Sequence, residues 1–242
     1  MDVFNVLFLI GRPAAGKSEI IDFLKRTETE ERRREFRIGD FTEFDDFPMI
    51  WTWFEEDHIL TDLGKPRLHT DADGYFAHTY MWNVLIRRLE LDYHKAVGDG
   101  ADFGGKETAI VEFARGTEHG GFAEAFSHFT PDFLNRGAIL YIDVPFEESL
   151  RKNRRRFNPD KPHSILEHGL PDDKLSKLYG EVDWHGLTAG TDSCLEIQGV
   201  RVPYAVFPNE DDVTTGLSPE LGPWLAETLT TLWERKTTEA DR

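Results

Sequence analysis

The chain has 242 residues, enough for one large α/β domain or two small ones, and its 39% hydrophobic content suits a folded protein with a substantial core. The formal net charge of −17 argues against extended nucleic acid and anionic membranes as partners, because both are bound by basic surfaces. The single cysteine, Cys194, excludes an internal disulfide and a cysteine-rich metal site. No apolar run reaches the length of about 18 residues that a membrane span requires, and no signal peptide is recognisable, so we expect a cytoplasmic protein.

The first predicted strand, Val3–Ile10, is a nearly continuous apolar run, typical of a central parallel strand covered on both faces. It leads into Gly11–Ser18, which fits the phosphate-binding pattern G-x-x-x-x-G-K-[ST], and then into a predicted helix over Glu19–Arg26. Glycines let backbone N–H groups curl around a phosphate, and the N-terminus of the helix adds a favourable field. We expect a nucleoside triphosphate here, with Lys17 reaching the β- and γ-phosphates and Ser18 ligating Mg²⁺. The residues expected to bind the nucleotide in this loop are Gly11, Arg12, Pro13, Ala14, Ala15, Gly16, Lys17 and Ser18.

The second predicted strand is Phe36–Phe41, with Asp40 at its end. Carboxyl ends of strands surround the ligands of open α/β sheets, so Asp40 is a candidate for the acceptor side of a catalytic site. The segment that follows, about residues 44–104, is rich in aromatic and acidic residues and predicts a helix over Tyr75–Val97. Most of its aromatic side chains are expected in the core, although one or two could stack on a substrate ring.

Two further strands, Thr108–Phe113 and Ala138–Val144, each carry an acid near their end, Glu112 and Asp143. An apolar strand that ends in an acid is typical of a Walker B element, whose carboxylate holds Mg²⁺ through water. Either acid is a candidate, and Glu112 ranks first because Asp143 could instead cap the following helix. Arg115, three residues after Glu112, could help to orient an acceptor and hold its anionic group, or could form a structural ion pair.

A predicted helix over Pro145–Phe157 carries five cations within six residues, which reverses the charge of this acidic chain locally. Helical spacing puts Arg151, Arg154 and Arg155 on one face, where they could stabilise charge on a transferring phosphoryl group. The alternative is ordinary placement of basic residues near a helix C-terminus. With the loop that follows, this helix predicts a lid over about residues 151–180.

The last predicted elements are a fifth strand, Val202–Phe207, a turn beginning at Pro208 and Asn209, and a helix over Pro219–Arg235. Five strands alternating with helices predict a three-layer α/β/α sandwich. Led by its phosphate loop, the layout resembles the P-loop nucleoside and nucleotide kinases, the adenylate-kinase-like group.

This resemblance implies a P-loop NTPase fold, with a five-stranded parallel sheet in the order 2-3-1-4-5. It also implies a single domain over 1–242, with an acceptor-side helical insertion at about 44–104 and the lid at about 151–180. Because the third strand then lies beside the first, the resemblance favours Glu112 over Asp143 as the acid near the metal. The residues it assigns to catalysis are Lys17, Asp40, Glu112, Arg115, Arg151, Arg154 and Arg155. It places Pro208 and Asn209 near the adenine, and Ser18 and Glu112 at the metal. The chain departs from the group in its longer, more aromatic insertion and in a lid without zinc cysteines.

The expected function is ATP- and Mg²⁺-dependent phosphoryl transfer to a small acceptor: a nucleoside, a nucleotide or another hydroxylated metabolite. The alternative is an ATP-binding regulatory module without acceptor turnover. A GTPase switch is disfavoured because the guanine-reading pattern N-K-x-D is absent, and a motor ATPase because no clear Walker B aspartate is present.

Overall fold

The structure is a computed structural model that describes residues 2–156, 160, 169–191 and 193–240. The strands are β1 (Val6–Gly11), β2 (Asp40–Asp45), β3 (Glu107–Phe113), β4 (Gly137–Asp143), β5 (Cys194–Ile197) and β6 (Val200–Pro208). The α-helices are α1 (Lys17–Arg26), α2 (Thr29–Glu31), α3 (Phe47–Asp62), α4 (Met81–Gly98), α5 (Gly121–Ser127), α6 (Pro131–Arg136), α7 (Phe146–Arg156), α8 (Asp172–Tyr179), α9 (Trp184–Thr188) and α10 (Leu221–Ala240). A π-helical turn covers Arg32–Phe36, and a 3-10 turn covers Thr117–His119. None of the described helices is both long and apolar enough to cross a membrane.

A six-stranded sheet in the order β2-β3-β1-β4-β6-β5 forms the middle layer, and all its pairings are parallel except that of β5 with β6. The predicted α/β class is confirmed. The prediction of five parallel strands in the order 2-3-1-4-5 is wrong. The strand expected as the fifth is β6, and β5 adds a sixth strand, antiparallel, outside it. A two-residue turn joins them, in which Gln198 and Gly199 both have positive φ (51° and 77°), as tight hairpins require.

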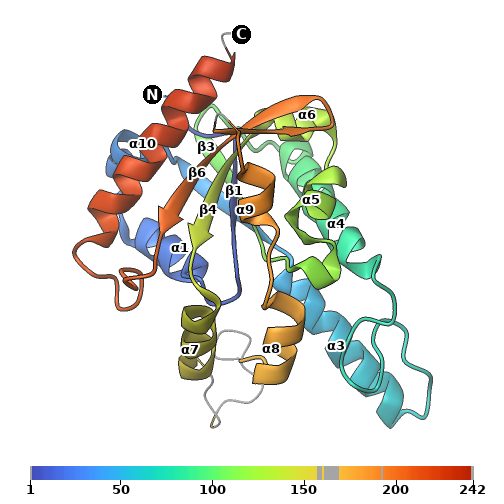
Figure 1. Cartoon of the computed structure of the whole chain (residues 1–242). Coiled ribbons are helices and arrows are strands. Elements are labelled where there is room, and N and C mark those ends of the chain that lie inside the picture. Colours follow the sequence, from blue (N-terminus) through green and yellow to red (C-terminus); the bar gives the residue numbers. More distant parts are fainter. Residues whose placement is uncertain (1, 157–159, 161–168, 192, 241–242) are drawn as a thin grey trace.

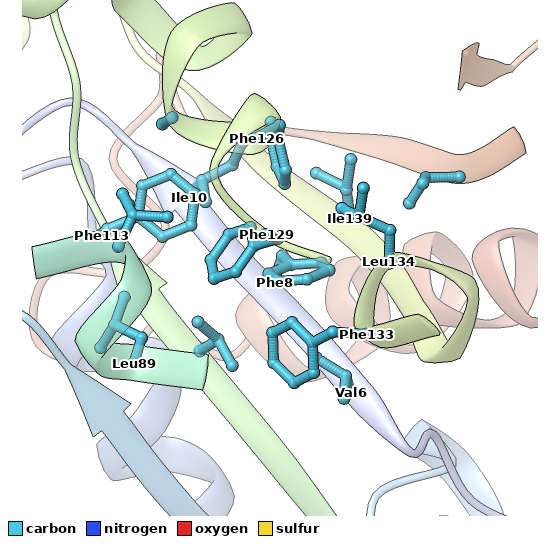
Figure 2. Close-up of a cluster of buried hydrophobic side chains, with 14 of the residues drawn as sticks. Val6, Phe8, Ile10, Leu89, Phe113, Phe126, Phe129, Phe133, Leu134 and Ile139 are labelled. Atoms are coloured by element: carbon cyan, nitrogen blue, oxygen red, sulfur yellow. The ribbon is translucent and has the colours of Figure 1, made fainter. Parts of the chain in front are cut away.

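Helices cover both faces of the sheet because the side chains of its strands alternate between two apolar cores. Figure 1 shows α1 and α10 on one side, and α4, α5 and α6 on the other. Along β1, Phe8 points into the core beneath α4, α5 and α6, where the centre of its ring lies 5.2–5.6 Å from the ring centres of Phe126, Phe129 and Phe133 (Figure 2). Leu7 and Leu9 point into the core on the other face of the sheet, against α1 and α10. A strand buried on both faces must be apolar throughout, which explains the continuous run in its sequence.

The second strand begins later than the sequence predicts, and this moves Asp40. Phe36 and Ile38 are buried beside α1 and α10, but neither lies in a strand. Phe36 ends the π-helical turn, and Arg37, between the two, has a left-handed backbone conformation (φ 56°). The apolar character of Phe36 and Ile38 therefore reflects packing beneath helices. Asp40 is the first residue of β2, paired in register with Glu107 at the start of β3. The prediction that this strand ends at Asp40 is wrong.

One helix also begins later than the sequence predicts. α4 begins at Met81 rather than near Tyr75, because the preceding chain is held in a β-bridge between Thr70 and Phe76. The stretch after Gly120 forms two helices, α5 and α6, and the second begins at Pro131 with Thr130 as its cap.

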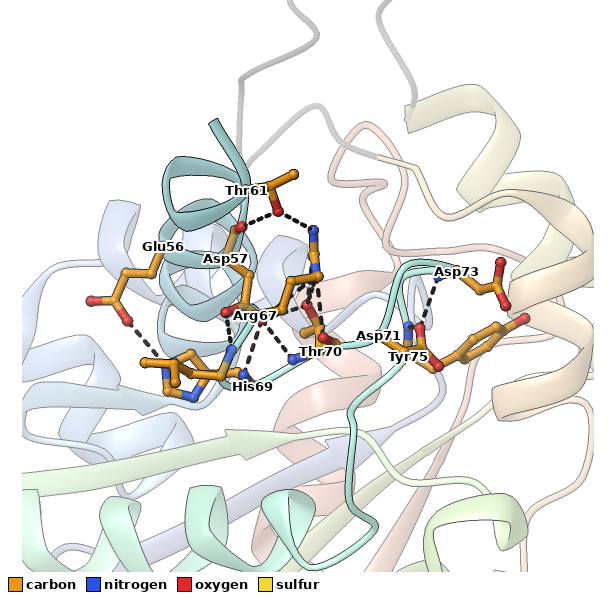
Figure 3. A network of polar contacts seen from close by, with 10 residues as sticks. Glu56, Asp57, Thr61, Arg67, His69, Thr70, Asp71, Asp73 and Tyr75 are labelled. Carbon is orange, nitrogen blue, oxygen red and sulfur yellow. Dashed lines mark hydrogen bonds and ion pairs between the residues drawn. The ribbon is translucent and has the colours of Figure 1, made fainter. Parts of the chain in front are cut away.

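The connection between α3 and α4 is anchored by a buried carboxylate, that of Asp57 (Figure 3). It accepts hydrogen bonds from the backbone N–H groups of Leu68, His69 and Thr70 and from the Thr70 hydroxyl, at 2.6–3.0 Å. Burial raises the pKa of Asp57, but these four donors outweigh burial and lower the pKa to about 2. The carboxylate therefore stays ionised at physiological pH and holds the connection against α3.

Helices α3, α4, α7 and α8 meet in a third apolar cluster that includes Trp82, Leu85, Leu175 and Tyr179. Figure 1 shows α3, α7 and α8 beyond the carboxyl ends of the parallel strands. Part of the predicted lid, residues 157–159 and 161–168, lies outside the described residues. The limits of the lid and of the insertion stay predictions.

Candidate functional site

A cavity of about 320 Å³ lies at the carboxyl ends of β1, β2 and β3. Its lining comes from the loop after β1, the ends of β2 and β3, the start of α3, and α7. Its polar and charged lining includes Lys17, Ser18, Asp45, Asp46, Glu112, Lys152, Arg155 and Arg156, and its apolar lining includes Phe47, Ile50, Ala114, Leu170 and Tyr179.

The loop Gly11–Ser18, here called the glycine loop, turns sharply between β1 and α1. Ala14 and Gly16 adopt left-handed or similar conformations, with φ of 56° and 112°. A Cβ atom at position 16 would lie 2.5 Å from the Thr214 hydroxyl oxygen and 2.7 Å from the Asn209 side-chain nitrogen, so only glycine fits there. The tight turn and the helix N-terminus together form a surface suited to an anion.

The glycine loop is supported from behind by Asn209, which is buried. Its side-chain nitrogen donates to the backbone oxygen of Ala15 (2.7 Å) and to the Thr214 hydroxyl (2.8 Å). On the α7 side, the Ser149 hydroxyl donates to the backbone oxygen of Pro13 (2.8 Å). Neither Pro208 nor Asn209 lines the main cavity: Pro208 lines a separate surface cavity beside α10.

Within the loop, Pro13, Ala14, Gly16, Lys17 and Ser18 line the cavity. Gly11, Arg12 and Ala15 do not. The Arg12 guanidinium donates instead to the backbone oxygens of Tyr179 and Gly180, and so ties the loop to the end of α8.

Glu112 is the predicted carboxylate that lies beside the glycine loop. Its Oε1 is 3.8 Å from Nζ of Lys17, which also donates to the backbone oxygen of Arg12 (3.1 Å). Asp143 lies elsewhere, on the other side of β1, with its Oδ1 3.5 Å from Nε2 of His185. The parallel order of β3 beside β1 therefore brings Glu112, and not Asp143, next to Lys17.

Asp45 and Asp46, at the end of β2, line the cavity where Asp40 was expected. Asp45 is paired in register with Glu112 on β3, so the two carboxylates lie side by side on one face of the sheet. The sequence contained a signal for this strand end: two consecutive acids just before Phe47 and Pro48, where a proline suits the start of a helix. Asp40 instead lies at the opposite end of β2 and pairs with Arg32 (3.2 Å).

The neighbouring carboxylates disturb each other's ionisation. Burial raises the pKa of Asp45 to about 8, with further contributions from the charges of Glu112 and Asp46. Burial also raises the pKa of Glu112, although Lys17 opposes this effect. With no cation bound, the cavity therefore holds a proton near neutral pH that a divalent cation would displace.

Arg115 is buried behind the cavity rather than exposed in it. Its Nη1 lies 2.7 Å from Oδ2 of Asp46, and only 1% of the residue is exposed. The same guanidinium donates to the backbone oxygens of Ala114 (2.6 Å) and Trp82 (3.2 Å). The structure thus brings Arg115 to the site as a structural partner of Asp46, not of Glu112.

The basic helix α7 turns a different face to the cavity from the predicted one. Lys152, Arg155 and Arg156 line it, whereas Arg151 pairs with Glu148 and Asp212, and Arg154 pairs with Asp172. Ser149, Lys152 and Arg156 follow helical i, i+3, i+7 spacing, and Ser149 is anchored to the glycine loop. Packing on that loop therefore sets the rotation of α7, which charge spacing alone does not reveal.

Among the described residues, no group of three or more His, Cys, Asp or Glu side chains is arranged to hold a metal ion on its own. Magnesium seldom needs such a group, because it binds one or two protein oxygens together with phosphate oxygens and water. Ser18, Glu112 and Asp45 supply oxygen ligands of the right chemistry beside the glycine loop. The cavity can thus receive an anion on the loop side and a cation or hydroxyl group near the carboxylates.

No family model matches the sequence, and no curated protein matches it at a significant level. Among solved structures, an unliganded sugar kinase from Janibacter sp. HTCC2649 is 15% identical, with a TM-score of 0.38, over 91% of this chain and 93% of that one. TT1252 from Thermus thermophilus is 11% identical, with a TM-score of 0.34, over 92% of this chain and 96% of that one. Similarity at this level does not identify an activity.

The raised pKa of Asp45 predicts a pH dependence of stability. The folded protein retains a proton that an ordinary aspartate, with a pKa of about 4, has already released. The free energy of unfolding should therefore fall as the pH rises from about 4 to 8. Asp45→Asn keeps an oxygen that can accept the hydrogen bond from the Phe47 N–H but cannot ionise. The variant should therefore not lose stability over this pH range, and at pH 8 it should be more stable than wild type by about 2 kcal/mol. The measurement is the thermal midpoint of wild type and variant between pH 5 and 8.5.

The control is Asp99→Asn, at an exposed position after α4. It should follow the wild-type pH profile. If Asp45→Asn also runs parallel to wild type, Asp45 does not hold the proton.

Proposed function

We propose that the chain is an ATP- and Mg²⁺-dependent phosphotransferase that phosphorylates a small hydroxylated acceptor. The observation that supports this most directly is the glycine loop at the end of β1, closed by a glycine that no other residue can replace without moving Asn209 or Thr214. A loop of this kind suits the β- and γ-phosphates, with Lys17 reaching over them from the first turn of α1.

The metal would be held by the Ser18 hydroxyl and by carboxylate oxygens of Glu112 and Asp45, directly or through water. Mg²⁺ held by these residues would neutralise part of the charge of the phosphates. Nζ of Lys17 lies 3.8 Å from Oε1 of Glu112. When MgATP binds, Lys17 would pair with a phosphate and Glu112 with the metal, in place of this ion pair.

Asp46 is the residue that we assign to the acceptor, with Arg115 as its positioning residue. The buried ion pair holds the Asp46 carboxylate at the cavity wall, where it can accept a hydrogen bond from the acceptor hydroxyl. In the transfer, the acceptor oxygen bonds to the γ-phosphorus and the bond from that phosphorus to the ADP oxygen breaks. The hydroxyl proton passes to a carboxylate and then to solvent. Asp40 has no part in this scheme.

Lys17→Ala should lower the rate of phosphoryl transfer at least about 100-fold, because the charge that develops between the β- and γ-phosphates loses its nearest cation. The rate is measured with MgATP and a panel of nucleosides, sugars and other alcohols, each against a blank without acceptor. The control is Lys25→Ala, which removes a lysine on the exposed side of the same helix.

Wild type should turn over far faster with one class of acceptor than in the blank. Tight MgATP binding without transfer to any acceptor would instead support the regulatory module. Unchanged activity of Lys17→Ala would contradict the assignment of the glycine loop.

Two neighbouring arginines of α7 differ in whether they face the cavity. Arg155→Gln should lower the transfer rate at least about 10-fold, because Arg155 lines the cavity where the γ-phosphate would lie. Arg154→Gln, the matched control, should change it less than about 3-fold, because the Arg154 guanidinium is exposed and paired with Asp172. Equal losses, or a larger loss at Arg154, would contradict this orientation of α7 in the working enzyme.

A further inference from the structure

The charges that line the cavity are separated by the elements that carry them. Every cationic side chain among the described lining residues comes from the glycine loop or α7: Lys17, Lys152, Arg155 and Arg156. The ends of β2 and β3 contribute three carboxylates instead, Asp45, Asp46 and Glu112. Apart from Glu19 in the first turn of α1, the lining carboxylates therefore lie on the side of β2 and β3, opposite the cations of α7.

The basic side belongs with the nucleotide, because α7 is joined to the glycine loop and to the segment behind it. Ser149 donates to Pro13, as described above, and Nζ of Lys152 lies 2.6 Å from Oδ1 of Asp212 and 3.4 Å from the Thr214 hydroxyl. Thr214 in turn contacts Asn209 beneath the loop. A triphosphate in the loop would thus face these cations, which leaves the wall made by β2 and α3 for the acceptor.

Behind the acceptor wall, Arg115 is fully engaged. The Arg115 guanidinium is paired with Asp46 and lies 5.1 Å from the centre of the Trp82 ring and 5.5 Å from that of Phe113. Turning it toward an acceptor phosphate would leave Asp46 buried without its counter-charge, a change that costs several kcal/mol in comparable buried pairs. Arg115 is therefore not available to hold an anionic group.

The remainder of this wall is apolar. Phe47 and Ile50 from α3, Ala114 after β3, and Leu170 and Tyr179 near α8 border the carboxylates. A phosphate or carboxylate on the acceptor would meet the Asp46 carboxylate and apolar side chains, whereas a hydroxyl group would meet a hydrogen-bond acceptor.

We infer that the acceptor is an uncharged alcohol with an apolar or aromatic part, such as a nucleoside, and not a phosphorylated or carboxylated compound. This inference rests on the proposed function and narrows it.

The test uses matched pairs of acceptors with MgATP and the full-length protein. Each nucleoside is compared with its 5′-monophosphate, each hexose with its 6-phosphate, and an aromatic alcohol with its carboxylated analogue. The neutral member of the preferred pair should have a kcat/KM at least 10-fold higher than the anionic member. If an anionic member is preferred while Lys17→Ala still abolishes transfer, the phosphotransferase stands and the acceptor class is wrong. If no member accepts phosphate, both proposals fail.

A charge variant tests the cause of the preference. Asp46→Asn leaves the buried cation of Arg115 without its carboxylate, so binding of anionic acceptors relative to neutral ones should rise at least 10-fold. Equilibrium binding in the presence of a non-hydrolysable MgATP analogue gives this ratio even where turnover is lost. Asp132→Asn, an exposed aspartate on α6 paired with Arg136, should leave the ratio unchanged. A ratio unaltered by Asp46→Asn would overturn the inference.

Discussion

The site depends on the parallel register of three adjacent strands. Leu9 of β1 and Asp45 of β2 are both paired with Glu112 of β3, so the ends of the three strands meet at one edge of the sheet. This pairing brings Lys17, at the end of the loop that follows β1, within 3.8 Å of Glu112 and sets a second carboxylate beside it. A shift of β2 by one residue would turn Asp45 to the other face of the sheet and separate its carboxylate from that of Glu112 at this edge.

The same edge is also supported from the far end of the chain. Asn209 and Thr214, between β6 and α10, lie directly beneath Gly16, and Asn209 holds the backbone oxygen of Ala15. The glycine loop is thus fixed to both the amino-terminal and the carboxyl-terminal parts of the fold. Such support costs nothing at the moment of binding, because the loop is already held in a conformation that suits an anion.

Long apolar runs made much of this fold predictable. The strands β1, β3, β4 and β6 begin and end within three residues of their predicted positions, because strands buried on both faces carry a continuous apolar signal. The edge strands lack that signal. β2 has mostly half-buried or exposed positions, and β5 has four residues, so neither stood out from the sequence around it.

Single side chains of the site were harder to predict, because their roles depend on packing. Spacing along α7 could not show that Arg155 rather than Arg154 faces the cavity, since the rotation of this helix follows from its contact with Pro13. Nor could spacing show that Arg115 pairs with Asp46. The two residues are far apart in the sequence, but they follow the ends of β3 and β2, which are neighbouring strands. The position of Glu112 beside the glycine loop could be predicted because its place near the end of an apolar strand is a local property, and its role at a metal stays a prediction.

The measurement that tests the central claim most directly is a crystal structure of the protein with Mg²⁺ and a non-hydrolysable ATP analogue. The account predicts the β- and γ-phosphates against the backbone N–H groups of residues 13–18, with Lys17 within hydrogen-bonding distance of the γ-phosphate. It also predicts the metal beside Ser18 and the carboxylate of Glu112 or Asp45. A triphosphate bound elsewhere, or a glycine loop left empty at saturating analogue, would contradict it.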